Sequence, residues 1–272
     1  MFKELFRIYG YREMLYNTVR KELRARYKGS VLGFLWTFVN PLLQLLIYSF
    51  VFNRIFGMNT APRDTGDTVP YSLWLFVALM PWNCISATIQ QSTNVILANA
   101  NLIKKVYFPR LILPLSLTVT NVVNMLLTFI IVLVVVVAGG FAPSWAYLAI
   151  PLLVFEVFLL CYSVSILLSG ITVYFRDLEH IITVFVQFWF YLTPIVYSAK
   201  DMIFGKGMSQ WAETAYQLNP AYGIVEGFRD IFIYGKLPDG NLIFSTIGIS
   251  LVILVIALAL FNRCQRRFAE EI

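Results

Sequence analysis

Six apolar stretches recur along this 272-residue chain, and short clusters of charged residues separate them. A helix of about 20 residues crosses the ~30 Å hydrocarbon core of a bilayer. Only 13% of the residues are charged, against about a quarter in a soluble domain. The pattern predicts a single all-α membrane domain over residues 1–272. We expect six transmembrane helices, at 31–56, 72–93, 113–138, 146–169, 180–198 and 242–262.

The lysine and arginine residues set the orientation of these spans. Of the 21, 15 fall in the N-terminal segment, the 94–112 and 170–179 connections, and the C-terminal tail. Because short cytoplasmic connections are enriched in cations, we expect both chain ends on the cytoplasmic side. Topology accounts for the net charge of +6 better than nucleic-acid binding does, since the cations border apolar spans.

The N-terminal segment 1–29 is basic and amphipathic. Apolar residues recur there every four positions, at Leu15, Val19, Leu23 and Tyr27. This spacing predicts a helix in the membrane interface, with cations toward the headgroups; a solvated basic tail is the alternative. Gly29 and Gly33 are the expected points at which the chain turns into the bilayer.

The connection 199–241 contains two short amphipathic stretches. One has apolar residues at Met208, Trp211, Ala215 and Leu218. The other follows Asn219-Pro220, a typical helix start, and has apolar residues at Ile224, Phe228, Ile231 and Phe232. Each is too short to cross the bilayer, so we expect two short re-entrant helices on the outer side.

Polar residues inside spans are costly, so their placement is informative. In three spans they recur on one helical face, among many aromatic residues. These faces predict the lining of a translocation path by Trp36, Thr37, Asn40, Gln44, Tyr48, Asn83, Ser86, Gln90, Thr183, Gln187 and Tyr191. Helix packing is the alternative, and it suits the small polar residues of the third span. The sixth span is almost wholly aliphatic and is expected to face lipid.

Motifs for catalysis or for metal binding are missing from the sequence. There is no nucleotide-binding P-loop, no nucleophile elbow and no metal-ligand cluster, and the one histidine is His180. Glu156 is the lone acid well inside a span, whereas a proton relay needs several ionisable groups. We therefore expect a transport subunit that is not itself an enzyme and that depends on a separate ATPase.

The sequence resembles the permease subunits of ABC-2 type exporters for lipid-linked polysaccharides, the group that handles O-antigen, capsule and wall teichoic acid. The resemblance covers the whole chain. It rests on RYKGSVLGFLWTFVNPLLQLLIYSFVF from Arg26, LIKKVYFPRLILP from Leu102, FRDLEHI from Phe175, YLTPIVYS from Tyr191 and NPAYGIVEGFRDIF from Asn219.

This resemblance implies the ABC-2 (type V) exporter fold in a bacterial cytoplasmic membrane. A homodimer would bind two copies of a cytoplasmic ATPase, which hold ATP and Mg²⁺, while this chain binds no cofactor and no metal. The 94–112 segment would couple to the ATPase through Asn99, Asn101, Lys104, Lys105, Tyr107, Phe108 and Arg110. The short outer helices would form an outer gate with Trp211, Tyr222 and Phe228. We further expect a substrate pyrophosphate to be met by Arg20, Arg24, Arg26 and Lys28.

Several functions remain open from the sequence. The leading one is ATP-driven export or flipping of an undecaprenyl-pyrophosphate-linked polysaccharide, with a slight preference for wall teichoic acid over O-antigen or capsule. An ABC-2 exporter of drugs or small lipids shares the architecture. A membrane scaffold of a cell-envelope assembly complex, with no transport activity, belongs to another class. An ion-coupled carrier is disfavoured, because it needs charged intramembrane sites or a second repeat half.

Overall fold

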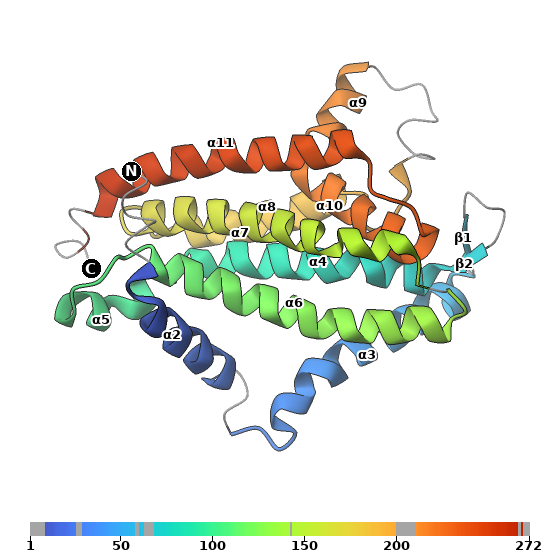
Figure 1. The fold of residues 1–272 in the computed structure, drawn as a ribbon, viewed down its shortest axis with the longest axis horizontal. Coiled ribbons are helices and arrows are strands. Elements are labelled where there is room, and N and C mark those ends of the chain that lie inside the picture. Colours follow the sequence, from blue (N-terminus) through green and yellow to red (C-terminus); the bar gives the residue numbers. More distant parts are fainter. Residues whose placement is uncertain are drawn as a thin grey trace.

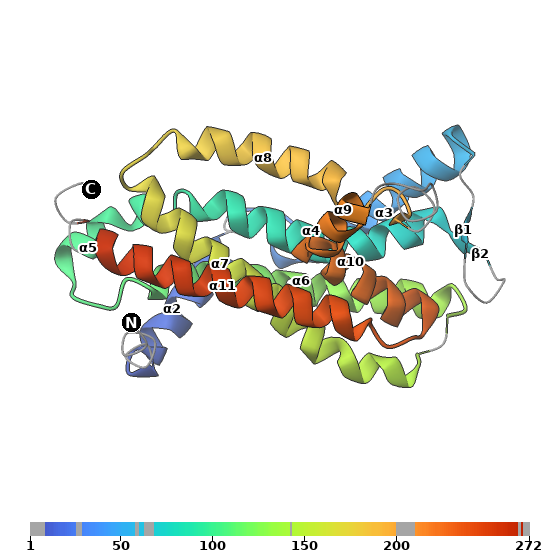
Figure 2. The same cartoon turned by 90° about the horizontal axis from the view of Figure 1, so that it is seen from above.

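The computed structural model describes residues 9–25, 29–57, 60–62, 68–141, 143–199, 210–265 and 268. Regular structure in these residues is helical apart from a short antiparallel pair, β1 (Thr60–Pro62) and β2 (Thr68–Pro70). The long helices run side by side along the long axis of one bundle (Figure 1). We call the end with α2 (Arg12–Ala25) and α5 (Ala100–Lys105) the α5 end. The opposite end, with the strands and α10 (Pro220–Arg229), is the α10 end (Figures 1 and 2).

Five helices in the described part of the chain are long and apolar enough to cross a membrane. The first combines a 3₁₀ turn, α3 (Trp36–Tyr48) and a π-helical turn into one helix from Gly33 to Ile55. The others are α4 (Tyr71–Ser92), α6 (Ile112–Ala138), α7 (Ile150–Thr172, preceded by a 3₁₀ turn from Trp145) and α11 (Gly240–Cys264).

The fifth expected span, 180–198, is a shorter apolar helix, α8 (Leu178–Leu192). It ends early because Pro194 disfavours the helical conformation of the residue before it. Thr193 is accordingly extended, with φ −94° and ψ 132°. The described chain thus has five long helices and one of 15 residues where the sequence predicted six full spans.

α4 is the central helix of the bundle. Every side chain from Tyr71 to Trp82 is buried, and the helix packs against α6, α7 and α10. The longest helix pairing joins α7 to α11, where Gly170 lets the ring of Phe261 approach closely. α11, expected to face lipid, therefore buries one face on α7 and leaves residues such as Val252 exposed.

The amphipathic helix predicted near the N-terminus is present as α2, and it packs against α6. Its Met14 and Leu15 contact an apolar cluster at the α5 end. Between α2 and α3 the chain bends sharply (Figure 1). Gly29 and Gly33 have φ of +82° and +49°, a conformation that glycine adopts without a steric penalty. Both glycines thus adopt a left-handed conformation in the connection between α2 and α3, where the sequence predicted a turn.

Two short helices lie between α8 and α11, as the sequence predicted. α9 (Gln210–Gln217) projects from the bundle, while α10 is buried within it (Figure 1). The side-chain oxygen of Asn219 accepts a hydrogen bond from the backbone N–H of Ala221 at 3.1 Å, which confirms the predicted helix start. Met208 lies outside the described residues.

Candidate functional site

A polar stripe on α4 is the clearest feature of the bundle that packing does not explain. Asn83 and Gln90 are exposed and Ser86 is partly exposed, although most of the helix is buried, and Asn94, two residues beyond the helix end, is exposed as well. Their spacing of three to four residues places them on one face. A central helix of the fold therefore presents a line of amides and a hydroxyl to its surroundings.

The stripe on α4 meets predicted path residues of α3. Nδ2 of Asn83 lies 3.5 Å from Oε1 of Gln44, and Nε2 of Gln44 donates to the Tyr48 hydroxyl at 3.2 Å. These three residues from two predicted lining spans thus form one polar chain. It joins the two helices without removing their exposed polar surface, since Asn83 remains exposed.

A second part of the predicted lining faces a hollow between α3 and α6. Trp36, Thr37 and Asn40 line a pocket of about 360 Å³ together with Asn124 and Thr128 of α6. The sequence favours helix packing for the polar residues of α6, the third predicted span. Asn124 and Thr128 do bond the backbone of their own helix, but they also enlarge the polar surface beside α3.

The third part of the predicted lining lies on α8 and is fully exposed in the single chain. Thr183, Gln187 and Tyr191 are all exposed, and Val186 is the only side chain of α8 that is buried. Contact with α4 runs through Trp189, whose ring centroid lies 5.5 Å from that of Trp82. The polar residues of α8 therefore remain free to meet another surface.

At the α5 end a pocket of about 630 Å³ lies between α2, α4 and α6. The carboxylate of Glu22 on α2 accepts hydrogen bonds from Ser116 at 3.3 Å and from Thr120 at 2.8 Å. Gln90 and Asn99 also line this pocket. The amphipathic helix is thus fixed by a charged hydrogen-bond acceptor beside the polar stripe of α4.

The predicted entrance residues lie on the other side of α2. Arg20 and Arg24 line a pocket of about 450 Å³, whose remaining walls are mostly apolar: Tyr16, Val19, Leu23, Gly33 and Phe34. Cations at the rim of an apolar pocket suit an amphiphile with an anionic head. Arg26 and Lys28 lie outside the described residues.

The predicted coupling segment divides into an exposed tip and a buried base. Asn101, Lys104, Lys105 and Tyr107 are exposed, and Tyr107 is 82% exposed. Asn99 is partly buried and donates to the carbonyl of Val95 at 2.8 Å.

Phe108 and Arg110 form the buried base. Phe108 is buried, and Arg110 donates to the carbonyl of Gln265 and lies over the ring of Phe268. Burial lowers the pKa of Arg110. These two residues attach the segment to the chain that follows α11.

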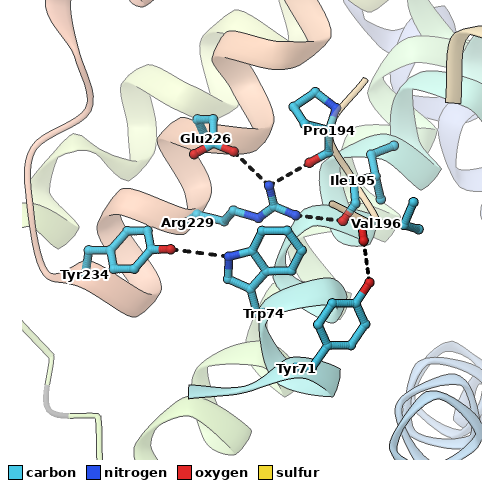
Figure 3. A network of polar contacts seen from close by, with 8 residues as sticks. All are labelled: Tyr71, Trp74, Pro194, Ile195, Val196, Glu226, Arg229 and Tyr234. Atoms are coloured by element: carbon cyan, nitrogen blue, oxygen red, sulfur yellow. Dashed lines mark hydrogen bonds and ion pairs between the residues drawn. The ribbon is translucent and has the colours of Figure 1, made fainter. Parts of the chain in front are cut away.

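The α10 end contains a buried arginine, Arg229, which is not among the predicted site residues (Figure 3). The side chain of Arg229 is fully buried, and its guanidinium carbon lies 3.3 Å from the ring centroid of Trp74. Nη1 donates to the carbonyl of Pro194 at 2.6 Å and to Glu226 at 2.7 Å, and Nη2 donates to the carbonyl of Ile195 at 2.7 Å. Elements far apart in sequence meet at this one side chain.

Residues of α4 complete this network. The Tyr71 hydroxyl donates to the carbonyl of Val196 at 2.5 Å, and Nε1 of Trp74 donates to the Tyr234 hydroxyl at 3.3 Å (Figure 3). The i, i+3 spacing of Glu226 and Arg229 in the sequence EGFRD was the available signal for an ion pair.

The three predicted gate residues at this end differ in exposure. Trp211 on α9 is 76% exposed, whereas Tyr222 and Phe228 on α10 are buried in the single chain. Phe228 stacks on Phe232 with ring centroids 6.2 Å apart. An outer gate at α10 would therefore be formed by the packing of buried side chains, whereas Trp211 is an exposed aromatic side chain.

The bundle, with five helices long and apolar enough to cross a membrane in its described part, is that of a multi-pass membrane protein. The chain matches the ABC-2 type transporter family across residues 15–233, and it belongs to that family. It is 33% identical to the O-antigen export system permease protein RfbA of Myxococcus xanthus, over 97% of each chain. It is also 33% identical to a permease of the same description from Klebsiella pneumoniae, over 95% of this chain and 94% of the relative.

Proposed function

We propose that this chain is the permease subunit of an ATP-driven exporter of O-antigen polysaccharide linked to undecaprenyl pyrophosphate. The observation that carries the proposal is the similarity to O-antigen export permeases over nearly the full length of both chains. It favours O-antigen over wall teichoic acid, toward which the sequence motifs gave a slight preference. The proposal sets the chain in a bacterial cytoplasmic membrane, with the α5 end in the cytoplasm.

The exposed polar residues support a path between two copies of the chain. Amides such as Asn83 and Gln90 are costly against lipid, yet they are exposed on the central helix, and Gln187 is exposed on α8. A second copy packed over these faces would remove them from lipid and enclose a polar passage. Amides and hydroxyls can bond sugar hydroxyls, and the aromatic residues among them can stack on sugar rings.

The α5 end supports docking of a separate ATPase. The exposed tip at Lys104, Lys105 and Tyr107 combines two cations with an aromatic side chain. Aromatic residues are enriched in protein interfaces, and the cations suit an acidic partner surface. Arg110 and Phe108 attach that tip to the core, so movement of a bound partner would reach the long helices. ATP and Mg²⁺ belong to that partner in this proposal.

The pocket at Arg20 and Arg24 supports entrance of the lipid carrier from the inner leaflet. The two guanidinium groups would hold the pyrophosphate, because arginine bonds phosphate oxygens in a bidentate manner. The apolar wall at Leu23 and Phe34 would contact the first isoprene units. The glycan would then pass toward the polar residues of α4.

ATPase stimulation tests the proposal. The chain is purified with its ATPase partner, reconstituted in proteoliposomes and given defined undecaprenyl-pyrophosphate glycans. We expect O-antigen glycans to raise the hydrolysis rate, and free undecaprenyl phosphate to leave it unchanged. Stimulation by drugs or short-chain lipids and by no glycan would overturn the proposal in favour of the drug-exporter alternative. A complex that no compound stimulates and that moves no glycan would favour the scaffold alternative.

A further inference from the structure

The chain stops being helical directly after α8. The backbone groups that follow therefore have few hydrogen-bond partners within a helix. The helix ends at Leu192, and Thr193, Pro194 and Ile195 are all buried. A buried carbonyl without a hydrogen-bond donor is costly in an apolar environment. Stability of this break therefore depends on donors supplied by other elements.

Three consecutive carbonyls of the break receive such donors from side chains (Figure 3). Arg229 of α10 donates to the carbonyls of Pro194 and Ile195, and Tyr71 of α4 donates to the carbonyl of Val196. We call this arrangement, with Arg229, Tyr71 and residues 194–196, the carbonyl clamp. It ties the outer end of α8 to two other helices.

We infer that Arg229 is a positioning residue of the translocation path, which fixes the outer end of α8 by holding the carbonyls of Pro194 and Ile195. The inference rests on the proposed function in taking α8 as a lining helix. A simple ion pair or an exposed cation would not fix the backbone of another helix in this way.

The chemistry of the site favours a guanidinium group over other cations. Its terminal nitrogens bond two successive carbonyls and Glu226 at the same time, a geometry that the single ammonium of lysine cannot reproduce. The guanidinium carbon also lies 3.3 Å from the ring centroid of Trp74, where cation–π attraction adds to the hydrogen bonds. Glu226 balances the charge, as its Oε1 lies 2.7 Å from Nη1 of Arg229.

Besides the clamp, only a few contacts among the described residues hold the outer end of α8: Asn219 accepts a hydrogen bond from Trp189 at 2.9 Å and donates one to Thr193 at 3.1 Å, and Trp82 packs on Trp189. Val186 is the only buried side chain of α8, and the contacts of this helix with α4 and α7 are limited. Figure 2 shows α8 running beside the bundle and joined to it at its two ends. Release of the clamp would let the outer end of α8 move relative to α4, and with it Tyr191 of the predicted lining.

Cysteine labelling in lipid nanodiscs tests the clamp independently of transport. The full chain carries Cys264→Ser and a reporter, Val196→Cys, and the rate of maleimide labelling is measured. We expect Arg229→Lys to raise that rate about fivefold, as loss of about one net hydrogen bond predicts. Tyr71→Phe removes only one donor and should give a smaller rise. Arg54 is an exposed arginine at the same end, and Arg54→Met is the matched control. Leu237→Cys is the control reporter.

Export by the complex with its ATPase tests the consequence for transport. We expect Arg229→Lys to leave the complex folded and assembled with its ATPase, with a modest fall in the thermal unfolding temperature, but to lower the polymer exported per ATP. The exchange Glu226→Arg with Arg229→Glu should not restore export, because it places no donor at the carbonyls. Restored export would show that the ion pair alone matters and would overturn the inference. Wild-type labelling and export in Arg229→Lys would also overturn the inference.

If the wild-type complex exports no glycan, the proposed function fails, and the labelling rates still decide the role of Arg229.

Discussion

At the scale of single residues, Glu156 on α7 is the most unusual buried group. Its side chain is 1% exposed, and neither carboxylate oxygen has a hydrogen-bond partner among the described residues. An ionised carboxylate in such a position costs several kcal/mol. In the sequence Glu156 is the lone acid well inside a span, whereas a proton relay requires several ionisable groups, so its charge is not expected to serve transport.

We predict that Glu156→Gln keeps export unchanged and unfolds at the same temperature as wild type or at a higher one. Glutamine has the same shape and no charge to bury. Thermal unfolding of the purified chain and export in cells check this, with the exposed residue Glu13→Gln as control. Loss of export in a variant that remains folded would assign the carboxyl a part in transport.

Glu22 is a residue whose charge we expect to matter for stability. Its carboxylate accepts hydrogen bonds from Ser116 and Thr120 of α6. Glu22→Ala should lower the free energy of unfolding by about 1–3 kcal/mol, since the two hydroxyls lose a charged acceptor. Glu22→Gln, which keeps one acceptor oxygen, should have about half that effect. Equal stability of all three proteins would contradict the contact between α2 and α6.

At the scale of elements, the coupling segment consists of an exposed tip, which we expect to bind the ATPase, and a base that packs against the core. We predict that Lys104→Glu with Lys105→Glu weakens ATPase binding at least about fivefold, because each exposed ion pair contributes up to about 1 kcal/mol. The fold of the permease should not change. Binding is measured by pull-down or light scattering, and the control reverses Arg176, an exposed cation of the α7–α8 turn. Unaltered binding would move the docking site elsewhere.

The amphipathic helix α2 gives a second prediction at this scale. Arg20→Glu with Arg24→Glu should abolish export, because two carboxylates would repel the pyrophosphate head. Arg12→Glu on the same helix lies outside the pocket of Arg20 and Arg24 and serves as control. Export is measured as surface O-antigen. Transport that survives the double reversal would rule out this pocket as the entrance.

The elements also show what the sequence could predict. Helix α2, the turn at Gly29 and Gly33, and the start of α10 at Asn219 follow from local periodicity and backbone preference. The end of α8 at Leu192 could have been inferred from Pro194. All of these features are determined by residues that are close together in the sequence.

The carbonyl clamp could not be predicted, because it depends on contacts between distant parts of the chain. Arg229 bonds carbonyls more than 30 positions away and lies over Trp74 of another helix. Hydrophobic patterning shows that a helix is present but not which helices will pack together. For the same reason Asn124 and Thr128, assigned to packing, line a hollow with Trp36, Thr37 and Asn40.

At the scale of the whole molecule, one copy of the chain leaves its polar surfaces open. The stripe at Asn83 and Gln90 and the residues Thr183, Gln187 and Tyr191 of α8 are exposed. Two copies facing each other would shield these surfaces from lipid and form the passage. The ATPase at the α5 end and the clamped outer end of α8 would then act on opposite ends of that passage.

Direct translocation of a lipid-linked glycan tests this account most closely. Proteoliposomes contain the permease, its ATPase and a fluorescent undecaprenyl-pyrophosphate O-antigen glycan, and a membrane-impermeant glycosidase reports which glycan lies on the outer surface. The account predicts that Mg-ATP moves the glycan away from the side of the ATPase. It also predicts that Gln90→Leu with Asn83→Leu slows this movement in a folded complex. Movement that is independent of ATP, or no movement in a complex that hydrolyses ATP in response to the glycan, would contradict it.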